Sequence, residues 1–231
     1  MRDCFEHMFN YRLNDRSSKP IILLTNKVED NAWLFFTLRI HLQESDMSEF
    51  TLHTKDTAPE ASKALLDNSQ AAFGMIPNLH AVMAEAPTLL EGYQVLHKLA
   101  QETSFNAEEL TVVWQAVNVE HACHYCVPAH TGIAKSMKVS DDLIEQLRND
   151  ETLSDAKLNT LKNTVLAVTR GRGNVDKSTL NAFYEAGYEH KQLLEIILIL
   201  AQKVMSNYTN HLADTPVDEP FKKFDWKPAK G

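Results

Sequence analysis

Apolar residues recur every three or four positions over most of the chain, which is the spacing of one face of an α-helix. Helix start and stop signals divide this pattern into segments. Pro59 and Gly74 bracket the first helix, because proline fits the first turn of a helix and glycine takes the left-handed position just past its end. The stretch from Leu79 to about Ala100 predicts one or two more helices, with Pro87 as the break.

The second half of the chain continues this pattern. Asn106 and Glu109 have the spacing of a capping box, and they predict a helix from Glu108 to about Val119. Strand signals are almost absent beyond residue 47, so the sequence predicts an all-α helical bundle. Further helices are predicted from Leu143 to about Arg148 after a cap at Ser140, from Leu158 to Arg170 before Gly171 and Gly173, from Asp176 to Ala186 before Gly187, and from about Lys191 to Asn210.

The last of these helices is apolar on nearly all sides between Leu193 and Ala201. A helix of this kind lies at the centre of a fold or in an oligomer interface. We therefore expect the protein to form a homo-oligomer. After Asp214 three prolines predict an extended tail.

Residues 1–46 lack the helical spacing of the remainder. They contain a strand-like apolar piece, Ile21 to Thr25, and a mixed piece, Trp33 to Leu42, without clear caps. Two interpretations stay open for this part: translated sequence upstream of a natural start at Met47, or a loosely held extension that completes a partner's surface. Residues 47–231 are predicted to form the helical domain.

Composition narrows the classes of function. The chain has 231 residues and a formal net charge of -8, which argues against nucleic acid or an anionic membrane as the main partner. Its three cysteines are too few for a disulfide-stapled secreted scaffold, so a reduced cytoplasm is the expected compartment. The most apolar run, Leu193 to Ala201, is interrupted by Glu195 and is far shorter than the roughly 20 residues that span a bilayer.

The segment from Glu120 to His130 points most directly at chemistry. Cys123 and Cys126 are three residues apart, so on a helix they share a face with His130 and can cycle between dithiol and disulfide. An imidazole beside two thiols lowers the free energy needed to form a thiolate.

Pro128 determines the local geometry. Inside an uninterrupted helix it would remove a backbone hydrogen bond and clash with the preceding turn, at about 3 kcal/mol or more. A new helix that begins around Tyr125 to Val127 avoids this, and it places Cys126 at a helix N-terminus. There the helix dipole favours a negative charge, so we expect the pKa of Cys126 to lie below the reference of about 8.5.

Three segments together resemble a known family. Glu-x-x-Cys-x-Tyr-Cys-x-x-Ala-His at 120–130 resembles the signature of the carboxymuconolactone decarboxylase-like superfamily, in its alkylhydroperoxidase D-like, peroxidase-related branch. Phe73-Gly-Met-Ile-Pro-Asn78 and Phe183-x-x-Ala-Gly-Tyr188 resemble the same branch, so the likeness covers roughly residues 50–226. The resemblance implies an all-helical homo-oligomer that uses two cysteines to reduce hydroperoxides, with no bound cofactor or metal.

The resemblance also implies roles for single residues. Cys126 would attack the terminal oxygen of a small hydroperoxide to give a sulfenic acid, and Cys123 would resolve it as a disulfide. His130 would be the base, with a pKa near neutral. The reductant would be a small dithiol or a dithiol-carrying protein. The position of Cys126 at a helix start favours the same assignment.

One position departs from the family pattern. Peroxidase members carry a glutamate about twelve residues before the first cysteine as a proton relay, and this chain has Thr111 there. Glu120 is the expected substitute, although a glutamate near a helix end is also typical of a solvated surface. Glu109 is expected to be a cap. Tyr125 stands at the middle position of the motif, where some members have histidine.

Two other interpretations of the cysteine pair are less favoured. Inert core packing does not account for the added His130 and the surrounding match, and a structural zinc site with His121 or His124, which we otherwise expect to be exposed, lacks a second knuckle. The alternative to an enzyme is a non-enzymatic, redox-responsive or structural oligomer, and turnover with a dithiol separates the two. Lactone decarboxylation belongs to another branch, and the cysteine pair argues against it. Four aromatic residues are expected in the core: Trp114, Phe183, Tyr188 and Tyr208.

Overall fold

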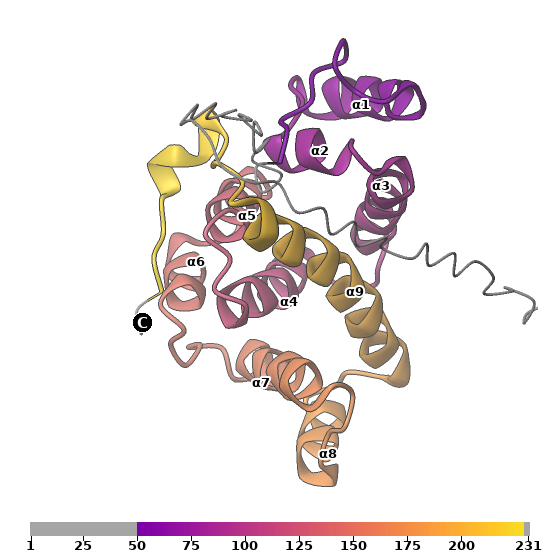
Figure 1. The fold of residues 1–231 in the computed structure, drawn as a ribbon. Helices are drawn as coiled ribbons and strands as arrows, with labels where there is room; N and C mark the ends of the chain where they lie inside the picture. Colours follow the sequence, from indigo (N-terminus) through magenta and orange to yellow (C-terminus); the bar gives the residue numbers. More distant parts are fainter. Residues whose placement is uncertain (1–49, 229–231) are drawn as a thin grey trace, which may run out of the picture. The chain divides into compact units, whose positions relative to one another are not determined.

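The structure is a computed structural model that describes residues 50–228 (Figure 1). These residues form nine α-helices and one 3₁₀-helix, and they contain no strand, so the all-α prediction is confirmed for this part of the chain. The predictions for residues 1–46 and for a start at Met47 lie outside the described residues. The elements are α1 (Glu60–Phe73), α2 (Asn78–Met83), α3 (Pro87–Gln101), α4 (Ala107–Glu120), α5 (Cys126–Ser136), α6 (Asp141–Arg148), α7 (Ala156–Gly171), α8 (Lys177–Glu185), α9 (His190–Ala213) and η1 (Glu219–Phe224).

The predicted helix caps are confirmed at most ends. The Asn106 side chain accepts a hydrogen bond from the Glu109 amide at 2.9 Å, and the Glu109 carboxylate accepts one from the Asn106 amide at 3.1 Å, so Glu109 is a cap as expected. Gly74 ends α1 in the left-handed conformation with φ 73°. The end of α7 differs from the prediction: Gly171 is still helical, and Arg172 takes the left-handed position with φ 51°.

Helix α4 lies at the centre of the packing, in contact with α5, α6, α7 and α9, while α3 packs along α9 (Figure 1). The core has two clusters. The larger one joins α4, α6, α7 and α9 around Trp114 and Phe183, which are 1% and 0% exposed. The smaller one joins α1, α2 and α3 to Cys123 and Cys126. The thiols therefore lie inside the hydrophobic core rather than on a surface loop.

One sequence prediction about the C-terminal third is wrong, and another is narrowed. Within the described residues α9 is buried on one side only, because Leu194 and Leu212 are 70% and 74% exposed while Ile196 and Ile199 are fully buried. The prediction of an oligomer interface on α9 stays a prediction. Tyr208 on the same outer face is 52% exposed and is not a core residue. Within residues 50–228, no helix is both long enough and apolar enough to cross a membrane.

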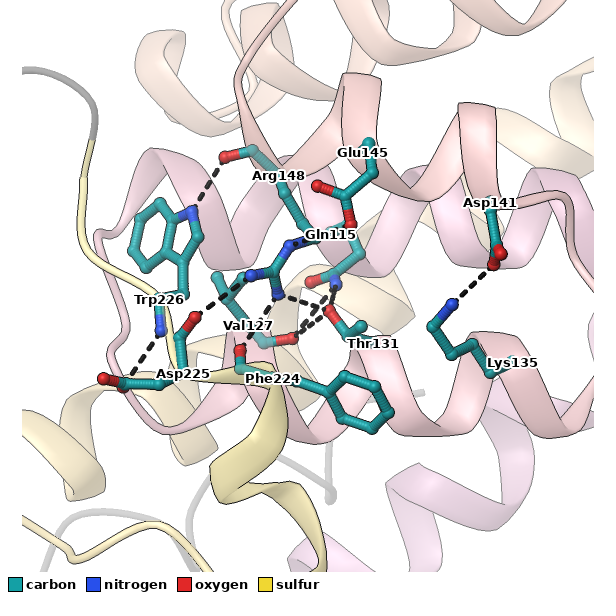
Figure 2. A network of polar contacts seen from close by, with 10 residues as sticks. All are labelled: Gln115, Val127, Thr131, Lys135, Asp141, Glu145, Arg148, Phe224, Asp225 and Trp226. Carbon is teal, nitrogen blue, oxygen red and sulfur yellow. Dashed lines mark hydrogen bonds and ion pairs between the residues drawn. The ribbon is translucent and has the colours of Figure 1, made fainter.

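The tail after α9 is not simply extended, since it contains η1, which packs on α5. Arg148 at the end of α6 anchors this segment (Figure 2). Its guanidinium donates to the carbonyl oxygens of Phe224 and Asp225, each at 3.1 Å, and to the Thr131 hydroxyl of α5 at 2.9 Å. The Trp226 indole N–H donates back to the Arg148 carbonyl oxygen at 2.8 Å. These hydrogen bonds tie the tail to two helices.

Gly132 provides the space that lets the tail approach α5. A Cβ atom at this position would lie 2.6 Å from Cε1 of Phe221 and 2.7 Å from Cδ1 of the same ring. Glycine is unfavourable inside a helix by about 0.8–1.0 kcal/mol relative to alanine, so its presence here serves the close contact. Gly92 of α3 is a useful contrast, because its nearest side-chain neighbour would be Met205 at 3.5 Å.

We expect Gly132→Ala to lower the free energy of unfolding by about 1 kcal/mol net, because overpacking of about 1–3 kcal/mol exceeds the gain in helix propensity. The matched control is Gly92→Ala, which should raise stability by about 0.5–1 kcal/mol. Urea unfolding measures both changes. Faster trypsin cleavage at Lys222 and Lys223 in Gly132→Ala would show that the tail has been displaced. Equal stabilisation by the two substitutions would contradict the packing argument.

Candidate active site

The two cysteines lie on a turn between two helices, as the position of Pro128 predicted. Helix α4 ends at Glu120, and Ala122 takes a left-handed conformation with φ 52°. The Cys123 amide then donates to the Asn118 carbonyl oxygen at 2.9 Å, which closes the end of α4. Helix α5 begins at Cys126, so the prediction of a helix start at this residue is confirmed.

Both thiols are free and buried, with Cys123 0% and Cys126 2% exposed. The Cys126 amide, in the first turn of α5, donates to Sγ of Cys123 at 3.3 Å. From α9, the Asn210 side-chain amide donates to Sγ of Cys126 at 3.3 Å. The sulfur atoms therefore lie among hydrogen-bond donors although they are surrounded by core residues.

Helix α9 presents a stripe of buried polar residues on the side that faces the thiols. Sequence analysis did not predict this stripe. Lys203, Ser206, Asn207 and Asn210 are all 0% exposed. Their spacing of three and four residues places them on one helix face. The side-chain amide of Asn207 also donates to Oδ1 of Asn118, on α4, at 3.0 Å. The signal was present in the sequence, because these polar residues interrupt an otherwise apolar helix at helical spacing.

Lys203 makes direct contact with the predicted base. Its Nζ atom lies 2.8 Å from Nε2 of His130, and both side chains are buried. A lysine ammonium only donates, so Nε2 accepts and the ring proton is on Nδ1, which has no partner among residues 50–228. The ring of Trp114 packs on His130 with centroids 4.8 Å apart. The orientation of His130 is thus fixed by α4 and α9 together.

The two thiols differ in acidity. Burial, the largest influence, raises the pKa of Cys126, but the adjacent Cys123 thiol, the charge of Lys203 and the nearby polar side chains of Ser206 and Asn207 outweigh it and lower the pKa below its ordinary value. The hydrogen bond with Cys126, together with burial, raises the pKa of Cys123. Cys126 is therefore the thiol that ionises, and Cys123 keeps its proton.

The imidazole does not have the near-neutral pKa that was expected. Burial and the adjacent charge of Lys203 hold the pKa of His130 well below its ordinary value. Burial also lowers the pKa of Lys203, while the negative charge of Cys126 and Cys123 acts in the opposite direction. His130 is therefore neutral at physiological pH.

A cavity of about 90 Å³ opens onto Cys126, His130 and Lys203. Most of its wall is apolar. The tail contributes two residues, Asp218 and Phe221. The remaining lining residues are Phe73, Pro77, Leu79, His80, Tyr93, His97, Tyr125, Ala129 and Ile133.

Tyr125 and Asp218 form the polar end of this cavity wall. The Tyr125 hydroxyl donates to the Asp218 carboxylate at 2.5 Å and accepts from the Leu79 amide at 3.3 Å. The other oxygen of Asp218 accepts from the Asn78 amide at 2.9 Å. Burial and the negative charge of Asp218 raise the pKa of Tyr125 well above its ordinary value, so the hydroxyl stays protonated.

A second, larger cavity of about 400 Å³ lies between α1 and α3. Phe73, His80 and His97 line both cavities and form the wall between them. Burial, with a smaller contribution from neighbouring charges, lowers the pKa of His80 and of His97 to about 4. Both rings are therefore neutral at physiological pH.

Glu120 is not brought to the thiols by any hydrogen bond within residues 50–228. Arg170 of α7 holds its carboxylate with two hydrogen bonds, from Nε at 2.8 Å and from Nη2 at 2.6 Å. Thr111, at the position where the family pattern has glutamate, is buried and donates to the Ala107 carbonyl oxygen at 2.8 Å. Neither side chain approaches His130 as a hydrogen-bond partner.

The other histidines of the motif are structural and only half exposed. His121 contacts Oδ1 of Asn207 through Nδ1 at 2.9 Å, and His124 contacts the Thr215 carbonyl oxygen through Nε2 at 2.9 Å. They fasten α9 and the tail to the cysteine turn. In the part of the chain that the structure describes, no group of three His, Cys, Asp or Glu side chains is arranged to hold a metal ion.

Comparison with known proteins gives a fold but no sequence relative. No protein-family model matches the sequence, and no curated protein matches it. Among solved structures, the alkylhydroperoxidase AhpD core of a peroxidase-related protein from Ralstonia eutropha JMP134 is similar with a TM-score of 0.66 and 17% sequence identity, over 75% of this chain and 94% of that one.

Two further structures have similar values. A peroxidase-related protein from Silicibacter sp. TM1040 has a TM-score of 0.62 and 17% identity, over 74% of this chain and 93% of that one. A variant of the debrominase Bmp8 in complex with 2,3,4-tribromopyrrole has a TM-score of 0.63 and 17% identity, over 75% and 93% of the two chains. The helical arrangement and these likenesses agree, and the chain has the alkylhydroperoxidase D-like fold.

Proposed function

We propose that the protein is a thiol-dependent peroxidase, or disulfide reductase, that reduces small organic hydroperoxides through a dithiol–disulfide cycle. The observation that carries the proposal is the convergence of Cys126, a buried thiol with a lowered pKa, with Cys123 and His130 at one apolar cavity. A thiolate is the nucleophile in this chemistry, so the acidity of Cys126 suits it to attack. The peroxidase-related structures with the same fold support the same class of reaction.

The cycle needs two thiols with different tasks. Cys126 attacks the terminal peroxide oxygen, which forms a sulfenic acid and releases an alcohol. Cys123 then attacks the sulfenic sulfur, and a disulfide and water result. His130 is the proposed base that organises proton transfer at the thiols. The hydrogen bond from the Cys126 amide to Sγ of Cys123 holds the resolving sulfur close to the first turn of α5.

The cavity limits the substrate. A volume of about 90 Å³ with a mainly apolar wall suits a small alkyl hydroperoxide better than a long-chain one. A small dithiol or a dithiol-carrying protein would return Cys123 and Cys126 to the reduced state, and the reducing cytoplasm would supply it.

This proposal has two alternatives. A non-enzymatic, redox-responsive or structural oligomer would oxidise its cysteines without turnover. The debrominase Bmp8 has a similar fold, and reductive debromination is therefore the second alternative. Oxidation of the Cys123–Cys126 pair to a disulfide would release the two electrons that either reduction needs. Assays with 2,3,4-tribromopyrrole beside cumene hydroperoxide separate the two enzymatic functions.

With cumene hydroperoxide and a dithiol donor, we expect Cys126→Ser and Cys123→Ser each to lower turnover by roughly 10³-fold or more, the scale of removing a nucleophile. The wild-type protein should lose two thiols per chain in a single turnover. A sulfenic acid should be trapped in Cys123→Ser only. Cys4→Ser, which keeps the pair, is the matched control. Thiols that persist for hours in excess hydroperoxide would exclude a peroxidase.

Two roles are predicted for Glu120, a proton relay and a solvated surface group, and its ion pair with Arg170 favours the second. We expect Glu120→Gln to keep turnover within about twofold and to lose at most about 1 kcal/mol of stability, as exposed ion pairs do. Arg170→Gln should give the same small loss. A fall of about 10²-fold in Glu120→Gln alone would instead identify a proton relay.

We further propose a homo-oligomer that covers the exposed apolar face of α9. Leu194, Ile197, Tyr208 and Leu212 on this face are 70%, 47%, 52% and 74% exposed. Light scattering should give a mass above that of one chain, and the double variant Leu194→Glu and Ile197→Glu should lower it. The control is Lys177→Glu on α8, which should leave the mass unchanged. A monomeric wild-type mass would contradict this proposal.

A further inference from the structure

Two lysines are buried in the described part of the chain, and their surroundings differ. Lys162 of α7 is 4% exposed and pairs with the Asp150 carboxylate at 2.7 Å. Lys203 of α9 is 0% exposed, and no carboxylate of residues 50–228 forms an ion pair with it. A buried ammonium group without an anionic partner is strongly unfavourable. Lys203 therefore either loses its proton or takes a negative charge from another kind of group.

Among residues 50–228, no carboxylate forms an ion pair with Lys203, and its imidazole neighbours carry no charge. His130 of α5 and His97 of α3 are both held neutral. Asp218 of the tail lines the same cavity, but its two oxygens accept hydrogen bonds from the Tyr125 hydroxyl and from the Asn78 amide.

Besides Asp218, the thiol pair is the source of negative charge at the cavity, and it is the one that acts on Lys203. Cys126 and Lys203 line the same wall, and the charges of Cys126 and Cys123 act on Lys203 in the direction that keeps its proton. The charge of Lys203 in turn favours ionisation of Cys126. A thiolate at Cys126 and an ammonium group at Lys203 would together form a neutral ion pair in the reduced site.

We propose that Lys203 is the counter-ion of the Cys126 thiolate and the proton donor to the alkoxide that leaves when Cys126 attacks a hydroperoxide. This inference rests on the proposed peroxidase function and adds a residue to it. Lys203 reaches the cavity beside His130, so its ammonium group faces the space where the peroxide binds. The hydrogen bond to Nε2 of His130 holds the lysine head group in this place.

The charges and atoms of this step balance. The thiolate sulfur of Cys126 forms a bond to the terminal oxygen, the O–O bond breaks, and the leaving alkoxide takes one proton from Lys203. Sulfur is oxidised and the peroxide is reduced. Lys203 is left as a neutral amine when the negative charge of Cys126 has gone. Cys123 then displaces hydroxide from the sulfenic acid, and the thiol proton of Cys123 leaves with it as water. Together, Lys203 and the two cysteines carry no net charge at any of these stages.

The counter-ion role is measured without peroxide, by the pH dependence of Cys126 alkylation with iodoacetamide, read from peptide mass in the reduced full-length protein. We expect the midpoint in Lys203→Met to lie about 1–3 pH units above that of the wild type. Lys203→Gln keeps a donor to His130 without the charge and should show the same rise. Lys162→Met is the matched control for loss of a buried lysine and should titrate like the wild type. Equal midpoints in all four proteins would overturn the counter-ion role.

Proton donation is measured separately, at a pH where Cys126 is ionised in each variant. With tert-butyl hydroperoxide, whose alkoxide is a basic leaving group, Lys203→Met and Lys203→Gln should react about 10²-fold more slowly than the wild type. With peracetic acid, whose carboxylate leaves without a proton, the deficit should shrink to about threefold or less. Equal deficits with the two oxidants would overturn proton donation.

The two measurements distinguish failure of this inference from failure of the proposed function. A wild-type protein that reduces hydroperoxides, with variants that titrate and react like it, contradicts the role of Lys203 alone. A wild-type protein that does not reduce hydroperoxides contradicts the peroxidase, while the alkylation midpoints still decide the ion pair.

Discussion

Desolvation of charge is the constraint on which the thiol site depends. Lys203, Cys126 and His130 all lie in the hydrophobic core, where an isolated charge is strongly unfavourable. The fold meets this constraint with a stripe of amide and hydroxyl groups on α9 and with an imidazole that stays neutral. Because no carboxylate pairs with Lys203 within residues 50–228, the sulfur atoms rather than an acidic side chain respond to its charge.

The same constraint explains why the segment after α9 belongs to the site. Asp218 and Phe221 form part of the cavity wall, so the space beside Cys126 is bounded in part by this segment. Its anchors are distant in sequence, since Arg148 comes from the end of α6 and Gly132 from the middle of α5. Both the core and the segment after α9 therefore help to exclude water from the thiols.

The sequence predicts correctly those features that depend on residues close together in the chain. The helix start at Cys126 follows from Pro128, and the cap of α4 follows from Asn106 and Glu109, because each signal acts within a single turn. The all-α fold followed from the spacing of apolar residues, and the resemblance of the motif agrees with the structures that share the fold.

Contacts between distant segments were beyond this reasoning. Lys203 contacts His130 across 73 positions, and no local signal in the sequence predicts that contact. The spacing that brings Glu120 to the cysteine side of α4 does not reveal Arg170, which lies 50 positions further along and binds its carboxylate. Tyr208 has the spacing of a core residue, but no element of the described chain covers it. Pairing across the fold, rather than local propensity, decides these three positions.

The wall shared by the two cavities contains neither Cys126 nor Lys203. Phe73, His80 and His97 touch both spaces, whereas Cys126 and Lys203 touch only the smaller one. Phe73 is 47% exposed at the end of α1, so its ring is held by few neighbours and its replacement disturbs little of the core. A smaller residue there would join a space of about 90 Å³ to one of about 400 Å³ without altering either sulfur. In the proposed peroxidase, the size of accepted molecules would thus depend on one side chain that the redox groups do not contact.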